Sequence, residues 1–136
     1  MMDSPQRTRS SAELNQLSQR VLDAAYRVHS ALGPGLLESA YEHCLAYELG
    51  KQGVAVARQV SIPIVYDGLE IDEGFRIDLL VENRLIVEIK AVDALMPIHQ
   101  AQLLTYLKLA NKQIGLLINF KVQSLKHGIK RMVHNL

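Results

Sequence analysis

The chain has 136 residues, of which 49% are hydrophobic and 21% are charged, and its formal net charge is +1. This length and composition predict one globular domain with an adequate hydrophobic core and no second domain. The near-neutral charge argues against a general polyanion binder, and no apolar stretch approaches the length that crosses a bilayer.

A single cysteine, Cys44, excludes an intramolecular disulfide and a zinc site built on paired cysteines. We therefore expect a reducing, cytoplasmic location. Residues 1–10 contain no apolar segment of the kind found in signal peptides. We expect them to form a short disordered tail, followed by a single domain over residues 11–136.

Two helices are predicted in the N-terminal part of the chain. Apolar residues recur every three or four positions from about residue 11 to residue 32, which is typical of an amphipathic helix, and Gly33-Pro34-Gly35 should end it. A second helix is expected from about Leu36 to Leu49, closed by Gly50 and Gly53.

Three strands follow, over residues 54–66, 69–81 and 85–91, and the dipeptide Asp67-Gly68 is a typical hairpin turn between the first two. Pro63 indicates that the first of them is an edge strand or contains a bulge.

Pro97 opens a third predicted helix that extends to about Asn111, and residues 114–120 form a fully apolar strand. Residues 124–133 are predicted as either a last strand or a short helix. The order predicts an α/β fold with a mixed sheet of four to five strands, in which a three-strand antiparallel meander, a helix and a further strand are flanked by helices.

Charged residues interrupt two of the apolar strands. Asp78 lies within the second strand, and the third reads Val87-Glu88-Ile89-Lys90. An isolated carboxylate in an apolar environment must be paired, bound to a metal or protonated. These positions are therefore the first candidates for a functional site.

The register of the hairpin decides whether the charged side chains meet, because side chains alternate between the faces of a strand. A three-residue loop, 82–84, segregates polar from apolar side chains, and we expect it for that reason. Asp78 then lies across from Glu88, with Arg76 and Lys90 on the same face. The opposite, apolar face is expected to carry Ile77, Leu79, Val81, Leu85, Val87 and Ile89.

Two carboxylates at this spacing suit Mg²⁺, which takes one or two carboxylates and completes its shell with water and phosphate oxygens. The neighbouring Lys90 could orient or help to deprotonate a water molecule and offset charge on a phosphate. The alternative is an ion-pair cluster of Arg76 and Lys90 with Asp78 and Glu88 that serves only the fold.

Asp78 followed by Glu88-Ile89-Lys90, on a meander between helices, resembles the PD-(D/E)XK nuclease superfamily, although Ile77 stands where its signature has proline. The segment Gly35-Leu36-Leu37-Glu38-Ser39-Ala40-Tyr41 is similar to the signature of the GxxExxY protein family within that superfamily. The likeness extends from about Val21 to Phe120.

The resemblance implies a nuclease that hydrolyses phosphodiester bonds in nucleic acid with Mg²⁺ or Mn²⁺. It implies that Asp78, Glu88 and Glu38 bind the metal with the main-chain carbonyl of Ile89, and that Lys90 assists the attacking water. Glu38 has a second interpretation, because a carboxylate in the first turn of a helix is stabilised by the helix dipole. Tyr41 could bind that carboxylate or a phosphate, or it could be a core tyrosine.

The third helix offers further candidates. Gln102 and Tyr106 share a helix face, and their spacing resembles the QxxxY motif of the recombination-exonuclease branch, where the pair orients the lysine or contacts substrate. His99, one turn earlier, could reach the phosphate or the metal shell, or it could cap the helix. His29 is either a ligand, as in some relatives, or a helix-surface residue.

No acidic residue follows Asp93, whereas six basic residues do: Lys108, Lys112, Lys121, Lys126, Lys130 and Arg131. They could line a phosphate-binding face or simply be solvated. The chain has no separate module for reading DNA, so a homodimer or a protein partner would supply specificity. The alternative function is a non-catalytic module that binds nucleic acid, a nucleotide or a protein.

Overall fold

The computed structural model describes residues 5–136, with side chains from Ser11 onward. The first helix, α1 (Pro5–Leu32), begins at Pro5 rather than at Ser11. The expected N-terminal tail includes residues 1–4, which lie outside the described residues. Within the described part, no helix is both long and apolar enough to span a bilayer.

The remaining elements follow the predicted order, and the segment expected to be a strand or a short helix contains one of each. They are α2 (Glu38–Lys51), β1 (Val56–Tyr66), β2 (Leu69–Val81), β3 (Leu85–Lys90), α3 (Pro97–Ala110), β4 (Ile114–Asn119), the short 3₁₀ helix η1 (Leu125–Gly128) and β5 (Ile129–Val133).

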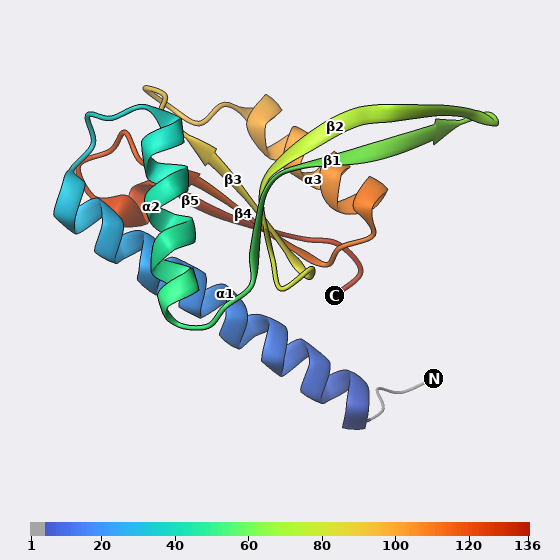
Figure 1. Ribbon diagram of the computed structural model, residues 1–136, viewed down its shortest axis with the longest axis horizontal. Helices are drawn as coiled ribbons and strands as arrows, with labels where there is room; N and C mark the ends of the chain where they lie inside the picture. The colour runs from blue at the N-terminus through green and yellow to red at the C-terminus, as the bar shows by residue number, and fades with distance from the viewer. Residues whose placement is uncertain (1–4) are drawn as a thin grey trace.

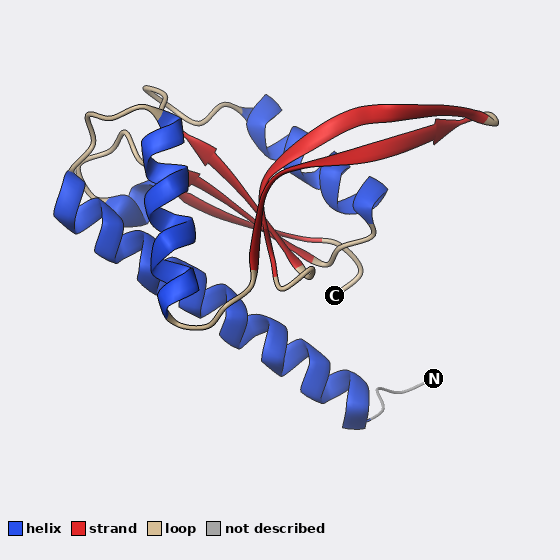
Figure 2. Ribbon diagram, viewed as in Figure 1, coloured by secondary structure: helices blue, strands red, loops and turns tan. Residues whose placement is uncertain are grey.

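The five strands form one mixed sheet in the order β1-β2-β3-β4-β5. The first three strands are antiparallel, β4 is parallel to β3, and β5 is antiparallel to β4. The parallel pair requires a crossover, which α3 supplies. Helices α1 and α2 cover one face of the sheet and α3 covers the other (Figures 1 and 2). The predicted α/β class is confirmed.

Two apolar layers hold the sheet between its helices. The larger joins α1 and α2 to inward residues of the central strands, among them Leu85, Val87 and Ile89 of β3. The smaller lies under α3 and includes Ile86 of the same strand. The alternation along β3 therefore places Glu88 and Lys90 on the α3 side of the sheet.

The predicted three-residue loop between β2 and β3 is confirmed, because Val81 pairs with Leu85 and Leu79 pairs with Val87. The prediction for Ile77 is wrong, because Ile77 packs under α3 instead of joining Leu79 in the α1 and α2 layer. The alternation of faces along β2 shifts at Asp78, where β2 parts from β3.

The outer parts of β1 and β2 form a two-stranded ribbon that extends beyond the sheet (Figure 1). Its turn at Asp67 and Gly68 has positive φ at both residues, as the sequence predicts for a hairpin. β1 is an edge strand, and its pairing with β2 shifts between Ile62 and Ile64, next to Pro63. Both interpretations of this proline are thus confirmed.

The fit of α3 on the sheet can be tested at Gly115 in β4. A Cβ at this position would come within 2.8 Å of the fully buried side chain of Leu103. We expect Gly115→Ala to lower the free energy of unfolding by about 1–3 kcal/mol, measured by urea denaturation. Gly50→Ala is the control, since nothing lies within 4 Å of its Cβ position in α2, and it should be neutral or stabilise by up to about 1 kcal/mol. Equal effects would contradict close packing of α3.

Candidate active site

Asp78 and Glu88 lie at the point where β2 separates from β3. The main-chain pairing of these strands ends at Leu79 and Val87. Beyond it, the N–H of Asp78 donates to Oε2 of Glu88 (2.9 Å), and the N–H of Ile89 donates to Oδ2 of Asp78 (2.8 Å). The two side-chain carboxylates thus accept the hydrogen bonds that main-chain carbonyls accept elsewhere in the sheet, and they lie between the separating strands.

Glu88 has a strongly raised pKa. Its burial, and next the negative charge of Asp78, raise the pKa of Glu88 to about 8. The hydrogen bond from the Asp78 main chain and the positive charge of Lys90 act in the opposite direction, and the charge of Glu42 raises this pKa further. Glu88 is therefore mostly protonated at neutral pH, and a carboxyl group perturbed in this way is a candidate for a functional site.

Lys90 ends β3, and its half-buried side chain lies close enough to act on the charge of Glu88. Arg76 is directed elsewhere and pairs with Glu73 at 3.5 Å. Between described side chains, no ion pair joins Arg76 or Lys90 to Asp78 or Glu88. The proposed alternative of an ion-pair cluster is therefore not formed.

A hydrogen-bonded connection from α2 to Asp78 was missed by the sequence analysis. The buried carboxylate of Glu42 accepts from Nη2 of Arg58 (2.9 Å) and from Nε2 of Gln59 (2.6 Å). The same Gln59 amide donates to Oδ1 of Asp78 (3.3 Å). Gln59 has a φ of 52°, a left-handed conformation that is uncommon for residues other than glycine. The only sequence signal was an acidic residue, Glu42, one helical turn after Glu38.

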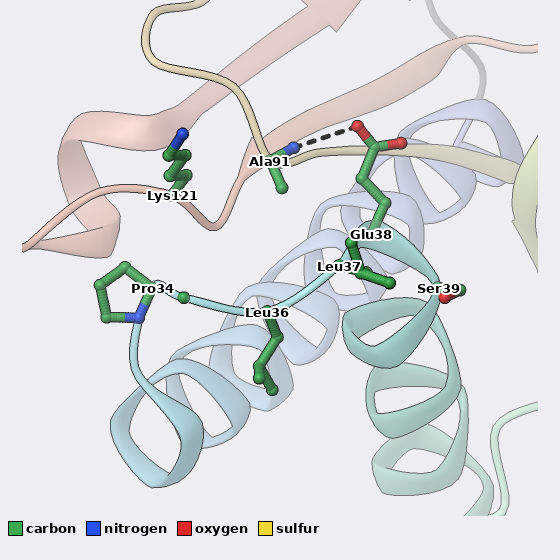
Figure 3. Close-up of a pocket in the computed structure, with 8 residues that line it drawn as sticks. Pro34, Leu36, Leu37, Glu38, Ser39, Ala91 and Lys121 are labelled. Carbon is green, nitrogen blue, oxygen red and sulfur yellow. Dashed lines mark hydrogen bonds between the residues drawn. The ribbon is translucent and has the colours of Figure 1, made fainter.

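Glu38 lies in the first turn of α2, as expected, although the helix begins at Glu38 itself rather than at Leu36, and its side chain reaches the end of β3. Its Oε2 accepts a hydrogen bond from the N–H of Ala91 at 3.2 Å, directly after Lys90 (Figure 3). A cavity of about 570 Å³ opens here, lined by the loop of residues 34–37 and by Lys121. Glu38 therefore borders the carboxyl ends of the parallel strands, where open α/β sheets commonly bind ligands.

Tyr41 has the structural environment of a core residue, one of the two interpretations of the sequence. Its hydroxyl donates to the carbonyl of Gly33 and accepts from the N–H of Leu36. Its ring is fully buried and stacks on Phe120 with centroids 4.4 Å apart. Tyr41 thus fixes the loop that leads into Glu38.

In α3, Tyr106 faces the carboxylates and Gln102 is exposed to solvent. Burial, then the negative charges of Glu88 and Asp78, raise the pKa of Tyr106. Its ring stacks on Phe75 of β2 with centroids 4.4 Å apart. Tyr106 therefore holds its hydroxyl proton at neutral pH next to the gap between β2 and β3.

The two candidate histidines, His99 and His29, each form a hydrogen bond with the main chain. Nδ1 of His99 accepts from the N–H of Met96 at 2.9 Å, which is the helix-capping arrangement. Nε2 of His29 donates to the carbonyl of Val122 at 2.8 Å, and the ring is buried. The interpretation of His29 as a surface residue is wrong, because it binds the segment that follows β4.

Asn119, at the end of β4, is a second residue that the sequence analysis missed. Its buried side chain accepts from the N–H of Val92 (3.1 Å) and donates to the carbonyl of the same residue (2.9 Å). It also accepts from the N–H of Lys121. Asn119 therefore fixes the chain directly after Lys90 against the neighbouring strand.

Residues 15–132 match the sequence profile of the PD-(D/E)XK nuclease superfamily. The chain belongs to this superfamily. A solved structure described as the crystal structure of SSO0001 has a similar fold, with a TM-score of 0.55 and 22% sequence identity, and the match covers 97% of this chain. This chain spans 63% of the length of that structure. No curated protein is significantly similar in sequence to the chain described here.

Proteins of this superfamily typically depend on a metal ion. The arrangement of the carboxylates shows whether the residues present could hold one. Among the described residues, no group of three or more His, Cys, Asp or Glu side chains is arranged to hold a metal ion. Glu38 is thus not gathered into one such group with Asp78 and Glu88. The two adjacent carboxylates, one of them mostly protonated, still fit Mg²⁺, because this ion usually binds one or two carboxylates and keeps several waters.

The protonation of Glu88 predicts a specific pH dependence of stability. Between the ordinary carboxyl pKa and about 8, the folded state binds more protons than the unfolded state, so the free energy of unfolding falls as the pH rises. Glu88→Gln should remove this loss, leaving the variant more stable than the wild type at pH 9 and similar at pH 4. Thermal unfolding in EDTA across this range measures both.

The control for this experiment is Glu70→Gln, since Glu70 is exposed on the outer ribbon. Its stability should follow the wild-type pH dependence. A Glu88→Gln variant that lost stability with rising pH as steeply as the wild type would contradict a protonated Glu88.

Proposed function

We propose that this superfamily member is a nuclease that hydrolyses phosphodiester bonds in nucleic acid with Mg²⁺ or Mn²⁺. The observation that carries the proposal is the crossed pair of hydrogen bonds by which Asp78 and Glu88 bridge the gap between β2 and β3. It places the two carboxyl groups beside Lys90, and no described side chain forms an ion pair with either of them. Within the superfamily, the segment from Gly35 to Tyr41 supports membership of the GxxExxY group.

Asp78 and Glu88 would hold the cation, with the main-chain carbonyl of Ile89 as a further oxygen ligand. The bound cation would polarise the phosphate and lower the pKa of a water molecule. Lys90 would orient the attacking water and offset the negative charge that develops on the phosphate. Glu38, at the carboxyl end of β3, would supply an additional acidic group at the mouth of the site.

The surroundings of the carboxylates support contacts to the substrate. Tyr106 keeps its hydroxyl proton next to the two carboxyl groups, and we propose that it donates a hydrogen bond to a phosphate oxygen. Gln102 and Arg76 are exposed, and His99 lies at the start of α3. We propose these residues as contacts along the nucleic-acid backbone, whereas Tyr41 would act by fixing the loop before Glu38.

Divalent cations should stabilise the folded protein if the gap binds them. At a cation concentration about ten times the dissociation constant, the free energy of unfolding should rise by about 1.4 kcal/mol, which corresponds to a rise in melting temperature of about 5 °C. Mg²⁺, Mn²⁺ and Ca²⁺ titrations followed by calorimetry measure this rise. It should disappear in Asp78→Asn.

Glu38→Gln tests the remaining acidic group in the same titration. A reduced response would assign Glu38 to the cation site, and an unchanged response would assign it to the bond with Ala91. An Asp78→Asn variant that kept the full wild-type response would contradict a cation site between the two strands.

The decisive assay is cleavage of labelled single- and double-stranded DNA and RNA, with Mg²⁺, Mn²⁺ or EDTA. Lys90→Ala should lower the cleavage rate by about 10²–10³-fold, because it removes a charge that stabilises the transition state. Lys126→Ala, which removes an exposed lysine of η1, is the matched control and should keep the activity.

Equal cleavage by wild type and Lys90→Ala would indicate a contaminating nuclease and would overturn the assignment of Lys90. A complete lack of cleavage by both proteins, together with cation binding that needs Asp78, would overturn the nuclease proposal in favour of a non-catalytic binding module.

A further inference from the structure

Gln59, in the edge strand β1, connects two carboxylates that belong to different elements. Its Nε2 donates to Oε1 of Glu42 at 2.6 Å and to Oδ1 of Asp78 at 3.3 Å. A side-chain amide nitrogen carries two hydrogens, so the two carboxylates use both of them. The orientation of the amide is therefore determined, because the reversed amide would place its oxygen against two other acceptors.

Glu42 holds this amide in a fixed position. It lies on α2 and is only 5% exposed. Its Oε2 accepts from Nε (3.0 Å) and from Nη2 (2.9 Å) of Arg58, which leaves Oε1 to Gln59. Hydrogen bonds between a guanidinium and a carboxylate are charge-assisted and geometrically specific. The position of the Gln59 amide is therefore set by α2 as well as by its own strand.

The main chain of β1 is distorted at the residue that reaches Asp78. The ladder pairs Arg58 with Leu79, which places the next residue, Gln59, across from Asp78. Neighbouring side chains of a regular strand point to opposite faces, yet Arg58 and Gln59 both contact Glu42. Gln59 departs from strand geometry with a φ of 52°, which accounts for the shared contact. Such a conformation is costly for a residue other than glycine and is commonly retained at functional sites.

Both strands change layer at this pair of residues. In β1, Val56 packs in the layer of α1 and α2 and Val60 packs under α3, although an even number of residues separates them. β2 makes the same change at Asp78. The distortion of the two strands therefore coincides with the contact between Gln59 and Asp78.

The contact restricts the carboxylate of Asp78. Its Oδ1 accepts from Gln59 in β1, and its Oδ2 accepts from the N–H of Ile89 in β3 at 2.8 Å. Donors on both oxygens, from the strands on either side, oppose rotation of the carboxylate about its Cβ–Cγ bond. A carboxylate oxygen has a second lone pair, so each can still bind a cation.

We propose that Gln59 is a positioning residue of the candidate active site, which sets the orientation of the Asp78 carboxylate, and that Glu42 holds its amide for this purpose. The inference rests on the proposed function, in which Asp78 binds a divalent cation. Gln59 acts on that cation only through Asp78. Residues that orient a metal ligand by a hydrogen bond typically change metal affinity by about 10–100-fold when they are replaced.

Gln59→Asn tests this role, because its amide is one methylene shorter and asparagine tolerates a positive φ. Isothermal titration calorimetry of the full chain should give an Mn²⁺ dissociation constant about 10–100-fold above that of the wild type. Gln59→Gly, which keeps the main-chain conformation without the side chain, should show the same loss. Asn111→Gly is the matched control, since Asn111 has a φ of 55° at the end of α3, and it should bind Mn²⁺ as the wild type does.

A second measurement needs no cation. In EDTA, the amide proton resonance of Ile89 reports the hydrogen bond to Oδ2 of Asp78. It should move upfield in both Gln59 variants, because the carboxylate is released, and stay in place in Asn111→Gly. Gln59 is exposed, so each variant should stay folded, which circular dichroism checks. A residue that only supported the fold would lower the melting temperature without changing this resonance or the dissociation constant.

The outcomes separate this role from the cation site itself. Gln59 variants that bind Mn²⁺ as tightly as the wild type, while Asp78→Asn does not bind it, would overturn the positioning role and leave the cation site intact. An Ile89 resonance that is unmoved in both Gln59 variants would overturn it as well. A wild type that binds no Mn²⁺, with a resonance that still moves in both variants, would support the orienting role and overturn the cation site.

Discussion

The architecture of the site depends on how two strands separate without losing their acceptors. Where β2 leaves β3, Asp78 and Glu88 each accept a hydrogen bond from the main chain of the other strand. Ordinary apolar side chains could not do this, and the N–H groups would remain unpaired in a half-buried place. The same two residues thus end the ladder and form the proposed cation site, so fold and candidate function share one pair of residues.

The sequence was sufficient for the elements and for the central register. Periodicity, turn dipeptides and the need to segregate polar from apolar side chains placed Val81 opposite Leu85, as observed. The sequence did not predict the place where side chains stop alternating regularly between the two faces of β2. Ile77 lies in the layer under α3 while Leu79 lies in the other layer, and no local sequence pattern marks this shift in the alternation of faces. Spacing alone left a metal site and an ion-pair cluster as alternatives for the pair of carboxylates, and the superfamily resemblance favoured the metal site, which stays a prediction.

The residues that were missed act through contacts between distant segments. Gln59 reaches Asp78 from an edge strand and is itself bound by Glu42 of α2, and Asn119 fixes the chain after Lys90 from the neighbouring strand. A single sequence shows none of these proximities. Likewise, the sequence of the first helix predicts a surface position for His29, whereas the structure buries it against the segment after β4. The role of a buried polar residue depends on its hydrogen-bond partners, and these partners are known only from the folded structure.

At the proposed cation site, the protonated state of Glu88 would link cation binding to acidity. A cation that enters between the carboxylates must displace the proton that burial and Asp78 retain there. Each binding event would therefore release up to one proton, and the apparent cation affinity would fall by up to roughly tenfold for each pH unit below about 8. An acidic medium would thus compete with the proposed metal for the same oxygen atoms, and the occupancy of the site would report the pH of its surroundings as well as the supply of cations.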